Sequence, residues 1–181
     1  MARVIPEIDT ARLRLRPFRS DDAPAVAALA GRPEIAATTL NIPHPYSRRD
    51  AETWIATHPG EVEGGRAWTF AITLRSGELV GAIGLHVVPA HRRAEVGYWI
   101  GVEHWGRGFA TEAVKAVLDF GFTTLKLNRI EAHVFAENAP SRRILEKLGF
   151  RYEGLLRRHV MKDGVPRDGL FFSLLSDDPR R

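Results

Sequence analysis

The sequence predicts a mixed α/β fold, in which a mostly antiparallel central sheet contains one parallel strand–helix–strand crossover and carries helices on both faces. Two observations predict it. Three strand-like segments follow one another between residues 67 and 100 with only short links, as in an antiparallel meander. Residues 94–135 then place a helix-like segment between two strand-like segments, and such a crossover makes its strands parallel and right-handed. No repeat or linker divides the chain, so we expect one domain over residues 1–181.

The first third of the chain predicts one strand and two helices. Apolar and arginine side chains alternate in its earliest segment, which is the period of a half-buried strand. The Ser20-Asp21-Asp22 sequence is typical of a helix start, and Ser47 predicts the cap of another helix. Pro33, Pro43 and Pro45 exclude a long helix between them. The expected elements are a strand at 11–16, helices at 20–30 and 47–58, and loops at 33–46 and 59–65.

The rest of the chain alternates strand-like and helix-like segments. Apolar residues recur at every second position in the former and at helical spacing in the latter. Asn138 is a favoured helix cap, and Gly149 fits the left-handed position that follows a helix. Asp163 and Gly164 predict the turn between the last two strands. The expected elements are strands at 67–74, 79–88, 94–100, 128–135, 151–161 and 168–175, and helices at 110–122 and 138–148.

The composition excludes several classes of protein. The 26 basic residues are spread along the chain rather than gathered into one tract, so a formal charge of +4 does not indicate a nucleic-acid partner. No apolar stretch is long enough to cross a bilayer, and no apolar leader follows the first residues. The absence of cysteine excludes disulfides and thiolate metal sites, and the seven histidines show no metal-ligand spacing. We expect a cytoplasmic protein without a metal, a nucleic-acid partner or a membrane partner.

A glycine-rich loop joins the strand at 94–100 to the helix that follows it. Gly106 and Gly108 flank Arg107 immediately before the helical run. Glycine lets backbone N–H groups approach a ligand closely, and a helix start adds unpaired N–H groups and the positive end of its dipole. This arrangement favours phosphate binding, although a glycine pair before a helix can also be only a tight turn. The spacing matches neither a Walker loop nor the three-glycine dinucleotide fingerprint.

Taken together, these segments resemble the GNAT superfamily of acetyl-CoA-dependent N-acetyltransferases. The residues that carry the resemblance are 94–100, 105–113, 136–141 and 146–150. The superfamily's pyrophosphate motif is Gln/Arg-x-x-Gly-x-Gly/Ala. Gly108 and Ala110 fill its last two positions, and Trp105 replaces the usual Gln or Arg. Residues 43–47 and Trp54 are similar to the branch that acetylates the N-terminal alanine or serine of ribosomal proteins.

The resemblance implies a GNAT-like sheet and acetyl-CoA as cosubstrate. Pantetheine would pair with backbone groups of Ile100 and Val102, and the thioester would lie where the two parallel strands separate. Asn138 would help to hold the cofactor in addition to capping its helix. Ser141 would protonate the leaving thiolate, although serine is also common in a first helical turn. The implied cofactor-binding residues are Ile100, Val102, Arg107, Gly108, Phe109, Ala110, Thr111 and Asn138.

Direct attack of an amine on a thioester needs a neutral amine, a polarised carbonyl and a proton for the thiolate. Glu95 is the candidate base, acting through water, because its strand borders the expected cleft. The alternative is that Glu95 forms a structural ion pair with a nearby arginine. No histidine is evidently placed to assist it. Backbone N–H groups near Val102 are candidate donors to the thioester oxygen.

The acceptor that we expect is the α-amine of a protein or peptide N-terminus. An α-amine has a pKa of about 7.7–8.0, against about 10.4 for lysine, so a modest base suffices. His44 and Tyr46 are the candidate substrate-binding residues, since the proline-rich connection should wall the acceptor site. The alternatives are acetylation of a small amine or aminoglycoside and a CoA-binding module without catalysis. The sequence leaves the oligomeric state open, a homodimer included.

Overall fold

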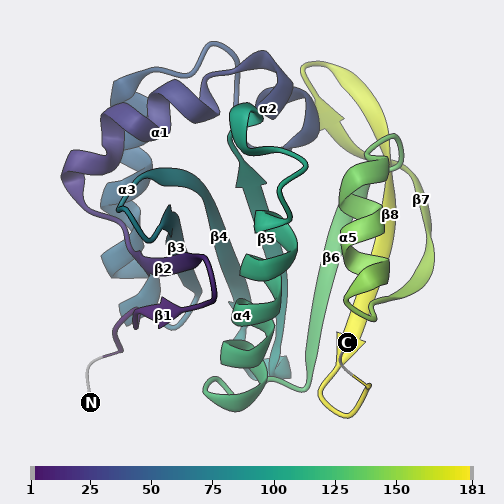
Figure 1. The fold of residues 1–181 in the computed structure, drawn as a ribbon. Coiled ribbons are helices and arrows are strands. Elements are labelled where there is room, and N and C mark those ends of the chain that lie inside the picture. The colour runs from purple at the N-terminus through teal and green to yellow at the C-terminus, as the bar shows by residue number, and fades with distance from the viewer. Residues whose placement is uncertain (1–2, 180–181) are drawn as a thin grey trace.

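The computed structural model describes residues 3–179, whose eight strands form one sheet in the order β1-β2-β3-β4-β5-β6-β8-β7 (Figure 1). The strands are β1 (Ile8–Asp9), β2 (Leu13–Pro17), β3 (Ala67–Leu74), β4 (Leu79–Val88), β5 (Arg93–Ile100), β6 (Arg129–Phe135), β7 (Arg151–Lys162) and β8 (Val165–Leu175). The helices are α1 (Ala23–Ala30), α2 (Pro33–Thr38), α3 (Arg48–Glu63), α4 (Phe109–Thr123) and α5 (Ala139–Lys147). Neighbouring strands are antiparallel except β5 and β6, which are parallel and joined through α4. The predicted fold class is confirmed.

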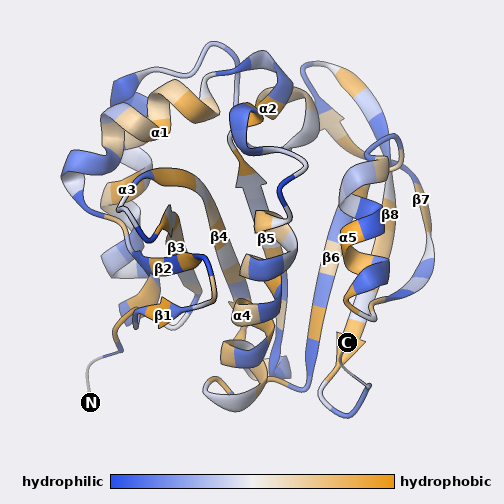
Figure 2. Ribbon diagram, viewed as in Figure 1, coloured by the Kyte–Doolittle hydropathy of each residue, from blue (hydrophilic) through white to orange (hydrophobic). Residues whose placement is uncertain are grey.

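Helices cover both faces of the sheet, with α4 and α5 on one face and α1 and α3 on the other (Figure 1). The period-two alternation of the strands divides the core accordingly. Phe70 and Ile83 share a buried cluster with the apolar face of α4. Their neighbours in sequence, Ala71 and Ala82, share a second cluster with α1 and α3. Figure 2 shows β4 as hydrophobic along most of its length, as expected for a strand that is covered on both sides.

The parallel pair β5–β6 is short. Only residues 93–95 pair with 129–131, although β5 continues to Ile100 and β6 continues to Phe135. The two strands therefore separate beyond Glu95 and Glu131. The edge of β5 that faces β6 is left with backbone groups that no neighbouring strand pairs, which is the condition for a ligand site at the carboxyl ends of parallel strands.

Helix α3 differs from the prediction, which ended it near His58 and placed a loop at 59–65. The helix continues through Pro59 to Glu63. Ser47 begins it as predicted, and its side chain and that of Asp50 cap each other's backbone N–H groups. Proline inside a helix removes one hydrogen bond, but the following turn buries Val62 against the main core. Burial of this apolar side chain offsets the lost hydrogen bond, a tertiary effect that the local sequence does not reveal.

Two short elements were not predicted, and one strand begins earlier than expected. Pro33 occupies the first turn of α2, where its missing N–H has no intrahelical role, so it starts a short helix inside the expected loop. β1 pairs with β2 at the edge of the sheet over two residues only. β8 begins at Val165, three residues before the expected start at 168, because Asp163 and Gly164 both have positive φ and form a tight hairpin turn.

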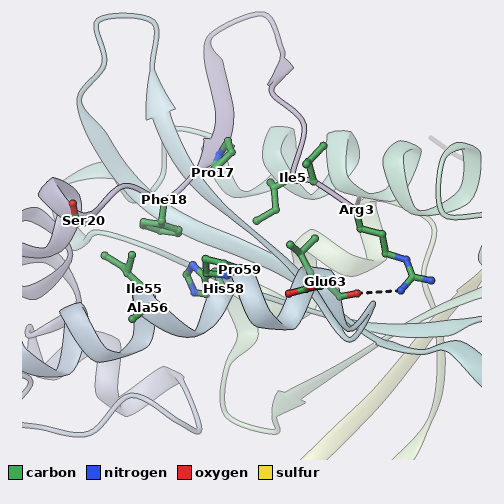
Figure 3. Close-up of a pocket in the computed structure, with 12 residues that line it drawn as sticks. Arg3, Ile5, Pro17, Phe18, Ser20, Ile55, Ala56, His58, Pro59 and Glu63 are labelled. Atoms are coloured by element: carbon green, nitrogen blue, oxygen red, sulfur yellow. Dashed lines mark hydrogen bonds between the residues drawn. The ribbon is translucent and has the colours of Figure 1, made fainter. Parts of the chain in front are cut away.

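A groove of about 840 Å³ lies between α3, the end of β2 and residues 3–5 (Figure 3). His58 belongs to its wall and is only 6% exposed, and neither of its ring nitrogens has a hydrogen-bond partner. Its ring packs on Phe18 and Trp54, at centroid distances of 5.3 and 4.6 Å. Burial disfavours the charged imidazolium and lowers the pKa of His58 from 6.5 to about 4.

This burial predicts an acid-sensitive contribution to stability. Between pH 6.5 and about 4, the unfolded chain binds a proton at His58 that the folded chain does not, so stability falls as the pH falls through that window. The full difference in pKa corresponds to roughly 3 kcal/mol. His58→Phe keeps an aromatic ring in place and removes the titration. In urea unfolding at pH 7.5 and 4.5, the wild type should lose about 2 kcal/mol more stability than His58→Phe. Equal losses in the two proteins would contradict the assignment.

Candidate active site

A cavity of about 460 Å³ lies beside the ends of the separating strands β5 and β6. Residues of α2, β5, the glycine loop, the first turn of α4 and α5 form its walls. The structure brings together seven residues that the sequence singled out, namely Ile100, Gly108, Phe109, Ala110, Thr111, Asn138 and Ser141. Five others do not line the cavity, namely Val102, Arg107, Glu95, His44 and Tyr46. The cavity has the position expected for a ligand at the carboxyl ends of parallel strands.

The glycine loop forms one end of the cavity. Gly106 and Gly108 have φ values of +73° and +79°, a conformation that other residues adopt only with strain. Gly108 immediately precedes α4, and its carbonyl accepts the first helical bond, from the Glu112 N–H. The N–H groups of Phe109, Ala110 and Thr111 therefore have no intrahelical acceptor. A loop of this shape at a helix start suits a phosphate group.

Two arginines flank this loop. The Arg107 guanidinium donates to His104 Nδ1 over 3.3 Å and lies 4.7 Å from the centre of the Phe109 ring. Arg12 also lies over that ring, at 4.9 Å, and donates to the Arg107 carbonyl. Glu112 holds Arg12 in an ion pair of 2.7 Å. The sequence did not single out Arg12, because it belongs to the turn before β2 and reaches the loop only through the fold.

The structure joins Tyr98 to the predicted pair Asn138 and Ser141. Asn138 Oδ1 accepts the backbone N–H of Ser141, so Asn138 caps α5 as the sequence predicted. The Ser141 hydroxyl lies 2.8 Å from the hydroxyl of Tyr98, and both residues line the cavity. Burial raises the pKa of Tyr98 to about 12, so its hydroxyl is protonated at neutral pH. The sequence contained one signal that could have identified Tyr98 as a site residue. Its hydroxyl lies on the face of β5 that is otherwise apolar, since Ala94, Val96 and Ile100 share that face.

Glu95 lies on the other face of β5 from Tyr98. Its Oε1 is 3.1 Å from His133 Nδ1, so its partner is a histidine and not the arginine considered from the sequence. The expectation that no histidine assists Glu95 is wrong, because β6 places His133 beside it. His133 in turn stacks on His159, at a centroid distance of 5.4 Å. Burial raises the pKa of Glu95, but the hydrogen bond and charge of His133 outweigh it, and the net pKa is below its ordinary value.

Val102, His44 and Tyr46 do not line the cavity. Val102 begins the 3-10 turn after β5 and packs against the cluster of α1 and α3. His44 Nδ1 is 3.1 Å from the Gly31 carbonyl at the end of α1, and Tyr46 packs on the same cluster. Ile35 and Thr38 of α2 line the cavity instead. The acceptor-binding roles of His44 and Tyr46 remain predictions.

Within residues 3–179, no three His, Asp or Glu side chains are grouped so that they could hold a metal ion. None of the helices there combines the length and the apolar character needed to cross a membrane.

The fold and the cavity define a class of protein, and comparison with known families identifies it. Residues 12–151 match the acetyltransferase (GNAT) domain, which is more than half of the chain. The chain therefore belongs to the GNAT family of acetyltransferases. The predicted family and the predicted enzyme class, an N-acetyltransferase, are confirmed.

Individual relatives agree with this assignment. The uncharacterized N-acetyltransferase YoaA of Bacillus subtilis (strain 168) is 37% identical over 174 residues, which cover 95% of this chain and 98% of that protein. The L-amino acid N-acetyltransferase AaaT of Escherichia coli (strain K12) is 25% identical over 162 residues, covering 88% of this chain and 95% of that protein. The structure of Mycobacterium smegmatis RimJ in complex with CoA-disulfide has a TM-score of 0.83 and 34% identity, covering 90% of this chain and 81% of that one.

The loop geometry predicts that backbone approach matters more than the arginine charge. Gly108→Val forces a β-branched residue into positive φ and brings its Cβ within 3.3 Å of Arg12 Nη2. Arg107→Ala removes a guanidinium that is already engaged by His104 and Phe109. By calorimetry, Gly108→Val should weaken CoA binding more than Arg107→Ala does, with thermal melting as the control for folding. Wild-type affinity in Gly108→Val would show that CoA does not use this loop.

Proposed function

We propose that the protein transfers the acetyl group of acetyl-CoA to the α-amine of a protein or peptide N-terminus. The observation that carries the transfer is the cavity where β5 and β6 separate. It offers the free N–H groups of the first turn of α4 at one place and the hydroxyl pair of Tyr98 and Ser141 at another. An anion site and a proton donor in one cavity are what a thioester of CoA requires. RimJ of Mycobacterium smegmatis, a solved relative, has been crystallised with CoA-disulfide.

In the proposed complex, the pyrophosphate takes backbone N–H groups between Arg107 and Thr111. Pantetheine extends along the unpaired edge of β5, where its amides add to the sheet as a further strand would. One acceptor on that edge is already engaged, because Trp105 Nε1 donates to the Ile100 carbonyl over 2.6 Å. Pantetheine would therefore use the remaining groups of β5 or share this carbonyl through its second lone pair.

The proposed reaction is direct acyl transfer. The amine nitrogen attacks the thioester carbonyl carbon and forms the new C–N bond, and collapse of the tetrahedral intermediate breaks the C–S bond. The leaving thiolate takes a proton from the Ser141 hydroxyl, which takes one in turn from the Tyr98 hydroxyl 2.8 Å away. Tyr98, whose pKa is raised to about 12 by burial, is protonated before the reaction and regains its proton from solvent before the next turnover.

The proton of the acceptor amine goes to Glu95, through water, in this proposal. His133 holds the carboxylate in place through its Nδ1, so Glu95 and His133 form one unit on the acceptor side of β5. Since the pKa of Glu95 is lowered, the carboxylate is a weak base at neutral pH. Generating the neutral amine at pH 7 costs about 1 kcal/mol for an α-amine and about 3 to 5 kcal/mol for lysine. A weak base therefore favours the α-amine.

A small amine is the second candidate acceptor. The relative AaaT is named for acetylation of L-amino acids, whose α-amines are the same functional group on a much smaller molecule. The same cavity and the same base would serve either acceptor, and the difference lies in what contacts the remainder of the substrate. A CoA-binding module without catalysis is less well supported, because it would have no use for the hydroxyl pair in the cavity.

One peptide with a free N-terminus and an internal lysine tests the acceptor. After incubation with enzyme and acetyl-CoA, mass spectrometry should place the acetyl group on the α-amine. Acetyl groups found chiefly on the lysine would refute the proposal. No modification of any peptide, together with turnover of free amino acids, polyamines or aminoglycosides, would make the small amine the acceptor.

The hydroxyl pair predicts a defect in turnover rather than in binding. Ser141→Ala and Tyr98→Phe each break the proposed route to the thiolate and should lower kcat by on the order of 10²-fold. Because the two hydroxyls act in series, the double variant should be little slower than either single one. Affinity for acetyl-CoA should stay near that of the wild type by calorimetry. A collapse of that affinity with normal turnover of bound substrate would make these residues binding groups only.

A further inference from the structure

Helix α5 presents two cations, Arg143 and Lys147, to the cavity. They are four residues apart, so they lie on the same face of the helix, one turn from each other. Among the residues that the structure describes, neither Arg143 nor Lys147 forms an ion pair or a side-chain hydrogen bond. Like charges at this spacing repel each other, so this face of α5 would be stabilised by an anion between them.

On the neighbouring face of α5, a cation at the same spacing does have a counter-ion. Arg142 also has a charged residue four positions ahead, but this is Glu146, and the two form an ion pair of 2.8 Å outside the cavity. Lys147 lies in the last turn of α5, where the negative end of the helix dipole stabilises its positive charge. Arg143 lies one turn earlier and gains less from the dipole. Glu137, a carboxylate in the cavity wall, is already paired with Arg167 over 2.6 Å. Two positive charges on this wall thus lack a counter-ion within the described chain.

Acetyl-CoA carries a group of the required charge that the proposed contacts leave without a partner. The pyrophosphate is assigned to the N–H groups at the start of α4, and each of its two phosphates has one ester bond, one anhydride bond and one negative charge. The phosphate on the 3′ position of the ribose is a monoester, with a charge between −1.5 and −2 near neutral pH. A guanidinium fork and an ammonium together match such a dianion in charge and in donor number.

We propose that Arg143 and Lys147 bind the 3′-phosphate of CoA and thereby distinguish CoA from dephospho-CoA. The inference rests on the proposed cofactor and adds a specificity to it. Helix α5 then serves both ends of the ligand: Ser141 in its first turn acts at the thioester, and its later turns hold the adenosine phosphate. Figure 2 shows hydrophilic residues along much of α5.

The test is calorimetry with CoA and with dephospho-CoA, which differ only in the 3′-phosphate. The variant is Arg143→Gln/Lys147→Gln, which keeps side-chain length and helix propensity, and the matched control is Arg142→Gln on the same helix. The wild type and the control should bind CoA about tenfold or more tightly than dephospho-CoA. The double variant should lose this preference through weaker CoA binding, while its affinity for dephospho-CoA changes little. Raising the salt concentration should narrow the preference in the wild type and have no such effect in the double variant.

Three results would overturn the inference. An equal loss of affinity for both ligands in the double variant would place the two cations at the pyrophosphate. An unchanged preference for CoA would show that they bind no phosphate of this ligand. Failure of the wild type to bind either ligand would refute the proposed cofactor itself. This outcome is distinguishable from failure of the 3′-phosphate inference, because it is measured on the wild type alone. Thermal melting of each protein separates these outcomes from a failure to fold.

Discussion

The separation of β5 and β6 after Glu95 and Glu131 is the constraint on which the rest of the structure depends. Parallel pairing joins only three residues of β5 to three residues of β6. Beyond them, the backbone N–H and C=O groups on the facing edges of the two strands need other hydrogen-bond partners. Trp105 supplies one by donating to the Ile100 carbonyl. The same separation leaves room for the cavity, and the glycine loop turns the chain out of β5 so that the first N–H groups of α4 face that cavity. Backbone geometry thus forms both the unpaired strand edge and the proposed anion site, independently of the side chains.

The alternation of side chains along β5 divides the proposed chemistry between the two faces of the sheet. Tyr98 points to the side of α4 and α5, where it meets Ser141. Glu95, at an odd spacing from Tyr98, points to the opposite side and meets His133 of β6. In the proposed reaction, the thiolate is protonated on one side and the amine loses its proton on the other. The strand itself keeps the donor and the acceptor of protons apart, so neither can neutralise the other.

The sequence was sufficient for features with a local cause. Alternation predicted the strands, glycines predicted the loop before α4, and Asn138 predicted the start of α5. Features with a tertiary cause were missed. Helix α3 passes Pro59 because burial of Val62 outweighs a lost hydrogen bond, and His133 meets Glu95 only because the crossover sets β6 beside β5. The pairing of Tyr98 with Ser141 likewise joins a strand to a helix 43 residues away, a contact that no local pattern encodes.

Hydrogen exchange with and without CoA tests the central claim most directly, because that claim concerns the backbone. If the gap beside β5 and the start of α4 hold the cofactor, amides between residues 96 and 111 should exchange more slowly when CoA is present, while those of β2 and β3 stay unchanged. The larger groove between α3 and residues 3–5 provides an internal comparison. Protection confined to that groove, or binding of CoA without any protection between residues 96 and 111, would contradict the account.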